Sequence, residues 1–276
     1  MKEIFGFDAF SPNEIAARIE SVGVVKARLP ILSMIMLGVL AGVFIGLGAM
    51  FYVLVSSDLS LSFGIARLLG GLVFSLGLIL VIVAGAELFT GNNLLVMAWA
   101  DGKLTIGEVF RNWIIICLSN FLGASGLAIL VYVSKHSDMN GGEVALNYIK
   151  IASVKCTISF QQAFFSGILC NIFVCLAVWM AQAGRSIIDK VIVIVFPVSA
   201  FVACGFEHSI ANMYIVPMAI LLKTQHTGVL NVEFISWIGF IKNLVAVILG
   251  NLIGGSVFVA MIYYVIYGRP LKTKRK

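Results

Sequence analysis

Two stretches of this chain decide its fold: AGAELFTGNN at residues 84–93 and CGFEHSIANM at residues 204–213. Each places polar and titratable residues inside an apolar run that is long enough to cross a lipid bilayer. Laid over one another, they share the pattern G-x-E-x-x-x-x-N at a constant offset of 120 residues. A charged side chain at membrane depth costs about 3 kcal/mol or more, so it is rarely kept without a partner or a function. We therefore expect both stretches to lie at a structural or functional centre.

The composition indicates a membrane protein. Hydrophobic residues make up 61% of the chain and charged residues 12%, whereas soluble domains carry about 25% charged residues. Apolar windows of about 20 residues or more, the length that spans a bilayer, lie near residues 31–55, 68–98, 112–133, 160–182, 191–222 and 240–267. The sequence predicts an all-α polytopic membrane protein with six transmembrane helices. Its mixed polar N-terminus predicts no cleaved signal.

The distribution of positive charge predicts the orientation. Thirteen of the 19 Lys and Arg residues fall in the N-terminal segment, the second and fourth loops and the C-terminal tail. By the positive-inside rule, both termini are cytoplasmic. This orientation accounts for the net charge of +6, and no basic face with interleaved aromatics predicts a nucleic-acid partner.

Three parts follow from this pattern. The capping box S-P-N-E at residues 11–14 predicts an amphipathic cytoplasmic helix within residues 1–30. A six-span transmembrane domain is expected over residues 31–267, and a basic cytoplasmic tail over residues 268–276.

The second and fifth apolar windows are too long for simple spans. Helices over 68–98 and 191–222 would overshoot a hydrocarbon core of about 30 Å at about 1.5 Å per residue. The polar, Gly-containing insert in each predicts a broken helix. Spans three and six also share N-x-x-G, which begins at Asn120 and again at Asn251. Because each half holds an odd number of spans, halves at about 31–135 and 155–267 predict an inverted repeat, with the substrate path at the two breaks.

Other functional classes are less well supported. The five Cys residues show no C-x-x-C spacing, so we expect neither a disulfide framework nor a metal site, and no motif indicates a cofactor. The adjacent Glu207 and His208 suit acid–base chemistry, but there is no H-E-x-x-H run and no nucleophile arrangement, so we do not expect an enzyme. A channel for a neutral solute is a further alternative.

The chain resembles the formate/nitrite transporter family of bacterial and archaeal membrane channels along essentially its whole length. The resemblance is carried by GGLVFSLGLILVIVAGAELFTG at 70–91, NIFVCLAVWMA at 171–181 and FVACGFEHSIANM at 201–213. GRSIIDK at 184–190 is most similar to the formate-channel branch, whereas Gly91-Asn92 is more similar to the nitrite branch.

This resemblance implies a homopentamer of independent pores in the lipid of the bacterial inner membrane, with an aquaporin-like fold in each protomer. It also implies transport of a small monovalent anion, with formate as the first expectation and nitrite or hydrosulfide as alternatives. The positions that match the family imply apolar constrictions at Leu78 and Leu88 beside Phe74 and Phe201, a mobile loop with Thr90 facing His208, a fourth span lined by Asn171 and Val174, and an electropositive approach at Lys155.

The chemistry of His208 suggests a mechanism. Desolvation favours the neutral imidazole, whereas an anion beside it favours the imidazolium. A small neutral acid crosses an apolar ring far more easily than a bare ion does. We therefore expect His208 to attract the anion and share a proton with it, while Thr90 donates a hydrogen bond from the other side.

The polar residues repeated in both halves suggest a structural role. Glu87 and Glu207 are predicted to support the broken helices by accepting hydrogen bonds from backbone N–H groups. Asn92 and Asn212 are predicted to bind other backbone groups that the breaks leave without helical partners.

Overall fold

The computed structural model describes residues 9–225 and 230–268. Residues 1–8 and 269–276 lie outside the described residues, and with them the start of the predicted N-terminal segment and almost all of the predicted basic tail. The helices are α1 (Pro12–Ala27), α2 (Ile31–Ser56), α3 (Phe63–Ile79), the π-helix η1 (Leu80–Gly85), η2 (Gly91–Leu94), α4 (Leu95–Ala100), α5 (Ile106–Val133), η3 (His136–Asp138), η4 (Asn140–Gly142), α6 (Glu143–Thr157), α7 (Phe160–Ala181), α8 (Ile187–Cys204), α9 (Ser209–Leu222), η5 (Lys223–Gln225), η6 (Val232–Phe234), α10 (Trp237–Gly255) and the π-helices η7 (Ser256–Met261) and η8 (Tyr264–Gly268).

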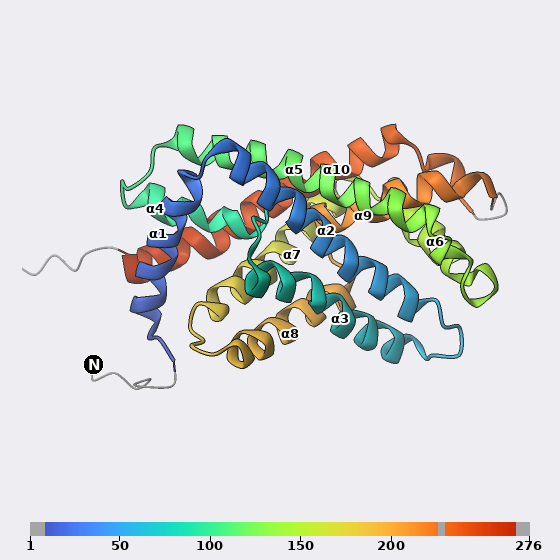
Figure 1. The fold of residues 1–276 in the computed structure, drawn as a ribbon, viewed down its shortest axis with the longest axis horizontal. Helices are drawn as coiled ribbons and strands as arrows, with labels where there is room; N and C mark the ends of the chain where they lie inside the picture. The colour runs from blue at the N-terminus through green and yellow to red at the C-terminus, as the bar shows by residue number, and fades with distance from the viewer. Residues whose placement is uncertain (1–8, 226–229, 269–276) are drawn as a thin grey trace, which may run out of the picture.

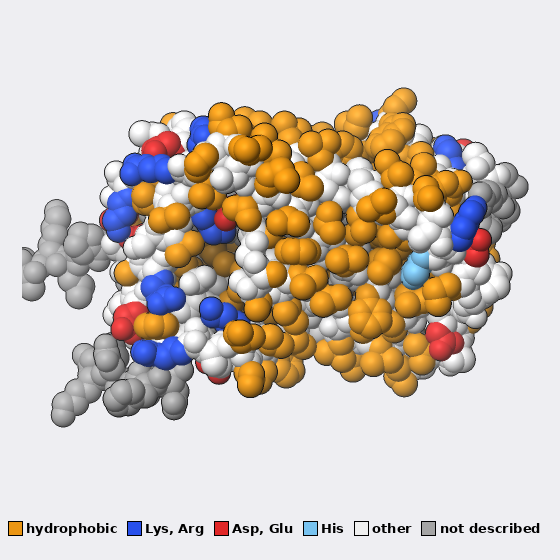
Figure 2. Space-filling view, viewed as in Figure 1, with side chains coloured by type: hydrophobic (Ala, Val, Ile, Leu, Met, Phe, Trp, Pro, Cys, Tyr) orange, Lys and Arg blue, Asp and Glu red, His pale blue; other side chains and the backbone are white. Residues whose placement is uncertain are grey.

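Among the described residues, six helical stretches are long and apolar enough to cross a membrane, which confirms the predicted all-α membrane protein with six spans. They are Ile31–Ser56, Phe63–Gly85, Ile106–Val133, Phe160–Ala181, Ile187–Cys204 and Trp237–Gly268. They form an elongated bundle with α1 at one end and α6 towards the other (Figure 1). Hydrophobic side chains cover the middle of its surface and charged side chains gather at its ends, as Figure 2 shows.

Both predicted helix breaks are present. The second span passes through η1 and ends at Gly85, whose φ is 87°, and the chain is then non-helical until η2 begins at Gly91. The fifth span ends at Cys204, and Gly205 follows with a φ of 76° before α9 begins at Ser209. Glycine is the residue that adopts positive φ without a steric penalty. The glycine shared by the two stretches therefore stops the helix in each.

α6 differs from the prediction, which placed no helix in this part of the chain. The helix carries Lys150 and Lys155, so it contains no apolar window of membrane length. It is held by packing instead, because Tyr148, Ile149 and Ala152 are buried and α6 contacts α9. Tertiary contacts of this kind leave no simple hydropathy signal.

Glycines let the helices approach closely. Gly38, Gly42 and Gly46 lie four residues apart on the face of α2 that packs against α5, and a Cβ atom at Gly42 would clash with the backbone of Asn120. In the second half, α7 packs against α10 in the same way, and a Cβ at Gly250 would clash with the α7 backbone. Small residues at these positions permit the tight packing that drives helix association in membranes.

The N-terminal helix α1 is built as the sequence predicts. Ser11 and Glu14 form the capping box, and Ile15 and Ile19 are buried, while Val22 is partly exposed. The helix is held by an ion pair between the buried Glu20 and Lys103. Asp101 lies 2.9 Å from the same ammonium group, and the hydrogen bonds from Lys103 to Glu20 and Asp101 raise the pKa of the lysine above its usual value.

Replacing Lys103 with Met is expected to loosen α1. The raised pKa means that the ammonium contributes stability throughout the range below pH 10, and the variant loses this contribution while leaving the Glu20 carboxylate buried without its partner. Because the lysine side chain is 45% exposed, we expect a modest loss of about 1 kcal/mol. Hydrogen exchange of the α1 amides should accelerate about fivefold. Lys190→Met is the control, and equal exchange in the two variants would contradict the assignment.

Candidate functional site

The polar residues of the first break form a buried cluster. Glu87 accepts a hydrogen bond from the side-chain amide of Asn92 at 2.7 Å and pairs with Lys26 of α1 at 3.0 Å. Asn92 also donates to Asn112 at 2.9 Å and accepts from Lys26 at 3.2 Å. The carboxylate is therefore bound by side chains from η2 and α1, and Asn112 of α5 joins the cluster through Asn92.

The second break repeats this cluster. Glu207 pairs with Lys155 of α6 at 2.8 Å and accepts hydrogen bonds from Asn212 at 2.7 Å and Asn243 at 3.2 Å. Asn212 donates in turn to Asn243 at 2.8 Å. Within the described part of the chain, all donors to this carboxylate are side chains, as they are at Glu87. The prediction that backbone N–H groups bind the two glutamates was therefore wrong.

The backbone groups of the breaks bind other asparagines. Asn120 of α5 donates to the Glu87 carbonyl at 2.9 Å and accepts from the Phe89 amide at 2.9 Å. Asn251 of α10 donates to the Glu207 carbonyl at 3.1 Å and accepts from the Ser209 amide at 3.1 Å. The predicted role of Asn92 and Asn212 as partners of these backbone groups was thus wrong, since their amides bind the carboxylates.

The sequence analysis missed Lys26, Asn112, Asn120, Asn243 and Asn251 as site residues, although the sequence carried a signal for them. Asn112 and Asn243 are separated by 131 residues, the same offset that relates the N-x-x-G motifs at Asn120 and Asn251. An offset of 129 residues likewise relates Lys26 to Lys155. A search for matching polar residues in the spans would have found the asparagines, whereas the two lysines lie in α1 and α6, outside the spans, and require a comparison of the whole halves.

The two breaks meet at His208 and Thr90. The Thr90 hydroxyl lies 3.2 Å from His208 Nε2. His208 is also the N-cap of α9, because its Nδ1 accepts a hydrogen bond from the Ala211 backbone amide at 3.1 Å. An Nδ1 that accepts carries no proton, so the neutral ring has its proton on Nε2, which faces Thr90.

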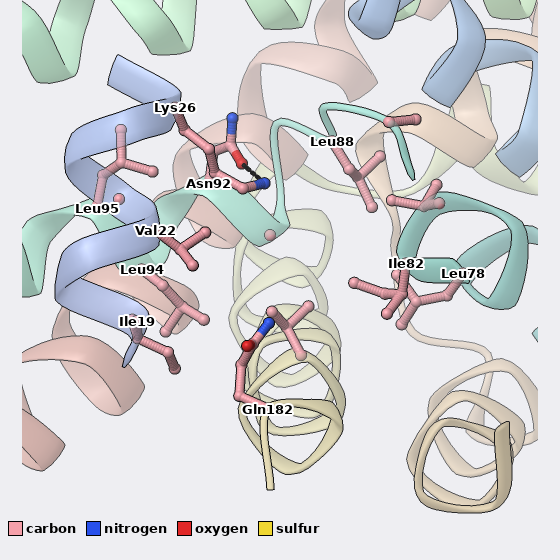
Figure 3. A pocket seen from close by; sticks show the side chains of 15 residues that line it. Ile19, Val22, Lys26, Leu78, Ile82, Leu88, Asn92, Leu94, Leu95 and Gln182 are labelled. Carbon is pink, nitrogen blue, oxygen red and sulfur yellow. Dashed lines mark hydrogen bonds between the residues drawn. The ribbon is translucent and has the colours of Figure 1, made fainter. Parts of the chain in front are cut away.

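Three cavities follow one another through the bundle. The first, of about 60 Å³, lies between α1 and the second span and is lined by Lys26, Asn92, Leu78 and Leu88. Figure 3 shows Leu78 and Leu88 on one side of this space, facing Ile19 and Val22 of α1. The second cavity holds about 10 Å³ and shares Leu78 and Leu88 with the first.

The third cavity, of about 320 Å³, opens beside α6 and shares Phe74, Phe201 and His208 with the central one. The Phe74 and Phe201 rings meet edge to face at 5.8 Å, and Phe201 stacks on His208 at 5.8 Å. Neighbouring cavities thus share walls at the Leu pair and at the Phe pair, which are the four residues expected at constrictions. The central space is about the size of one water molecule.

The comparison with known families agrees with this geometry. The family model described as formate/nitrite transporter matches residues 13–265. The chain belongs to this family. It is 40% identical to the formate channel FocA of Escherichia coli, over 98% of each chain, and 37% identical to the uncharacterized transporter YrhG of Bacillus subtilis, over 96% of each.

Solved structures show the same relationship. The chain is similar to a pentameric formate channel with formate bound, at a TM-score of 0.80 and 41% identity, with 87% of this chain and 98% of that chain covered. It is also similar to an ion channel of the formate/nitrite transporter family, at a TM-score of 0.83 and 28% identity, with 93% and 99% covered.

Three more predicted site residues, Val174, Asn171 and Lys155, line these cavities or contact a residue beside them. Val174 lines the central cavity. Asn171 is fully buried, and its amide donates to the Thr90 carbonyl at 3.2 Å and to the Asn251 carbonyl at 2.7 Å. These contacts place Asn171 behind the Thr90 loop, and its contact with a permeating anion stays a prediction. Lys155 lines the wide cavity, where it binds Glu207.

Proposed function

We propose that this protein is a channel for small monovalent anions, with formate as its main substrate. The observation that carries the proposal is the meeting of Thr90 and His208 beside a central cavity bounded by the Leu78–Leu88 and Phe74–Phe201 pairs. The similarity to the FocA formate channel supports formate in particular. A protonated formate is small enough for so narrow a path, and an apolar ring admits a neutral acid far more readily than a bare ion.

His208 acts as the hydrogen-bond donor for the anion. His208 lines the central cavity and its Nε2 proton faces the Thr90 hydroxyl. An anion that enters between the two groups can share this proton through a carboxylate oxygen while the Thr90 hydroxyl donates from the opposite side. Complete transfer of this proton requires that Nδ1 be protonated first, because the ring otherwise becomes an imidazolate. Protonation of Nδ1 breaks its bond with the Ala211 amide. Proton sharing in the hydrogen bond is therefore the role that the geometry favours.

The assembly and orientation form part of the proposal. The protein works as a homopentamer in the bacterial inner membrane, as supported by its similarity to a pentameric formate channel. Both termini are cytoplasmic, which places the α1 side of the pore inside the cell. The matching clusters at Glu87 and Glu207, near α1 and α6 at opposite parts of the bundle, support an inverted repeat with halves at about 31–135 and 155–267. The chain is a channel and not an enzyme.

Flux through the purified protein in liposomes tests this function. We expect formate to enter far faster than in protein-free liposomes, and the flux to rise as the pH falls. Nitrite, hydrosulfide, acetate and lactate are measured in parallel, and liposome shrinkage under an osmotic gradient without anions measures neutral solutes. Water or glycerol flux without formate flux would refute the proposal. Faster nitrite than formate flux would move the protein to the nitrite branch.

Replacing Leu88 with Ala is expected to relax selectivity. The side chain is 2% exposed and forms part of the wall between the first two cavities. The shorter alanine widens an apolar constriction that acts as a desolvation barrier. We expect lactate flux to rise about tenfold while formate flux changes less. Ile82→Ala, on the same side of the first cavity but absent from the central one, is the control. Unchanged lactate flux in Leu88→Ala would show that the narrowest point lies elsewhere.

A further inference from the structure

Arg67 is fixed at the wide cavity beside α6 by contacts with two other helices. It lies in α3, and its Nε donates to the carbonyl of Ala203 in the last turn of α8 at 2.8 Å. Its Nη1 donates to the hydroxyl of Tyr52 of α2 at 3.3 Å. Both Arg67 and Tyr52 line the cavity. The guanidinium group therefore has a defined position at this wall of the pore.

The position of Arg67 reverses an unfavourable local field. The carbonyl end of a helix carries a partial negative charge, and α8 ends at the cavity, where it would repel an approaching anion. Arg67 binds the Ala203 carbonyl at this end and replaces the negative potential with a positive one. Gly205 makes room for it, since a Cβ atom there would clash with Arg67 Nη2. Gly205 therefore allows both the positive-φ turn of the second break and the position of the Arg67 side chain.

Of the charged residues along the cavity wall, Arg67 is the one that is both held in place and able to attract an anion. Three cations line the cavity: Arg67, Lys150 and Lys155. Lys155 is bound to Glu207 at 2.8 Å, so that pair adds no net charge. Lys150 is exposed. Among the described residues, no carboxylate forms an ion pair with Arg67, so its charge is uncompensated.

We propose that Arg67 is an anion-binding residue at the mouth of the α6-side cavity, where it receives a small oxyanion before His208 does. Its Nη2 group takes no part in the bonds to Ala203 and Tyr52, so it is the donor that an oxyanion oxygen binds. This role deepens the proposed function and rests on it. Lys155 then acts mainly by holding Glu207, and Arg67 carries the electropositive approach that was assigned to Lys155.

Two substitutions separate the charge of Arg67 from its structural bonds. Arg67→Gln keeps an amide donor for the α8 carbonyl and removes the charge, whereas Arg67→Lys keeps the charge and loses the planar fork. Formate flux into liposomes is measured against formate concentration at low and high ionic strength. We expect the half-saturating concentration to rise about fivefold in Arg67→Gln, with maximal flux nearly unchanged, and to change less than twofold in Arg67→Lys.

Salt dependence and a control complete the test. The rise of the half-saturating concentration with ionic strength should be weaker in Arg67→Gln, because less charge is left to screen. Lys242→Met removes a cation from α10 outside this cavity and should match wild type. Wild-type half-saturation in a stable Arg67→Gln protein would overturn the proposal, as would equal losses in the Gln and Lys variants, which indicate a structural role only. A wild-type protein without formate flux would overturn the proposed function itself, and this role with it.

Discussion

Replacing Glu207 with Gln is expected to destabilise the protein strongly, even though the two side chains have nearly the same shape. The three partners of the Glu207 carboxylate are Lys155, Asn212 and Asn243, and all of them donate hydrogen bonds. A glutamine turns one of its two acceptor oxygens into a donor, so one of these donors faces an N–H group. It also leaves the Lys155 ammonium, with only 13% of its side chain exposed, without a counter-charge.

The expected size of this effect follows from the burial of the pair. Removing one partner of a buried ion pair costs about 3–5 kcal/mol, which corresponds to a fall of roughly 10 °C in the thermal midpoint of the detergent-solubilised protein. Glu87→Gln is the matched control from the other half. Its partner Lys26 is 29% exposed, so the loss there should be smaller, about 1–3 kcal/mol.

A compensating change makes the prediction specific. In Glu207→Gln the unpaired ammonium causes most of the loss, so adding Lys155→Met should recover part of the stability. A single Glu207→Gln variant as stable as wild type would show that the carboxylate does not carry the charge on which this account depends. Equal losses at Glu87 and Glu207 would show that burial of the lysine partner is not the deciding factor.

The broken helices could be predicted from the sequence because two independent physical limits apply to them. The thickness of the bilayer sets the length of a span, and the polar insert with its glycine indicates where an overlong apolar window is interrupted. The positive φ of Gly85 and Gly205 agrees with that prediction. The Leu and Phe pairs at the constrictions came from the family resemblance, because an apolar side chain in an apolar span carries no signal of its own.

The partners of the polar groups could not be predicted in the same way. Glu207 binds Lys155, 52 residues away, and Asn243, 36 residues away. Such contacts depend on how the spans pack, which periodicity within one span does not report. Backbone N–H groups were expected to bind the carboxylates of Glu87 and Glu207 because they are the nearest donors along the chain. In the structure, Asn120 and Asn251 bind the backbone groups of the two breaks, and the carboxylates of the glutamates bind side chains.

The role of His208 as the N-cap of α9 could not be predicted from the sequence either, and it changes what is expected of His208 variants. Histidine is not among the usual N-cap residues, which are Ser, Thr, Asp and Asn. In this protein Nδ1 of His208 accepts a hydrogen bond from the Ala211 amide, and Nε2 lies within hydrogen-bond distance of the Thr90 hydroxyl. A single ring therefore performs a structural and a functional task. A substitution that removes both tasks gives no information about either one alone.

Replacing His208 with Phe and with Asn separates these tasks. Phe removes the cap and the donor, so we expect a loss of about 1 kcal/mol in stability and a fall of at least about tenfold in formate flux, since a hydrogen bond to a charged group is worth about 1.5–3 kcal/mol. Asn is a good N-cap, and its amide offers an acceptor for Ala211 together with an N–H donor for the pore. Its stability should match wild type, and its flux should stay within about threefold.

The pH profile of the Asn variant decides how the proton is handled. An amide does not titrate, so a variant whose formate flux still rises as the pH falls needs no imidazolium, and the pH dependence then comes from the growing fraction of neutral acid. This is the result we expect, because protonating Nδ1 would break the bond that begins α9. If flux in the Asn variant is instead independent of pH while wild type responds to it, the imidazolium must form in the pore, and the Ala211 bond must open in every transport cycle.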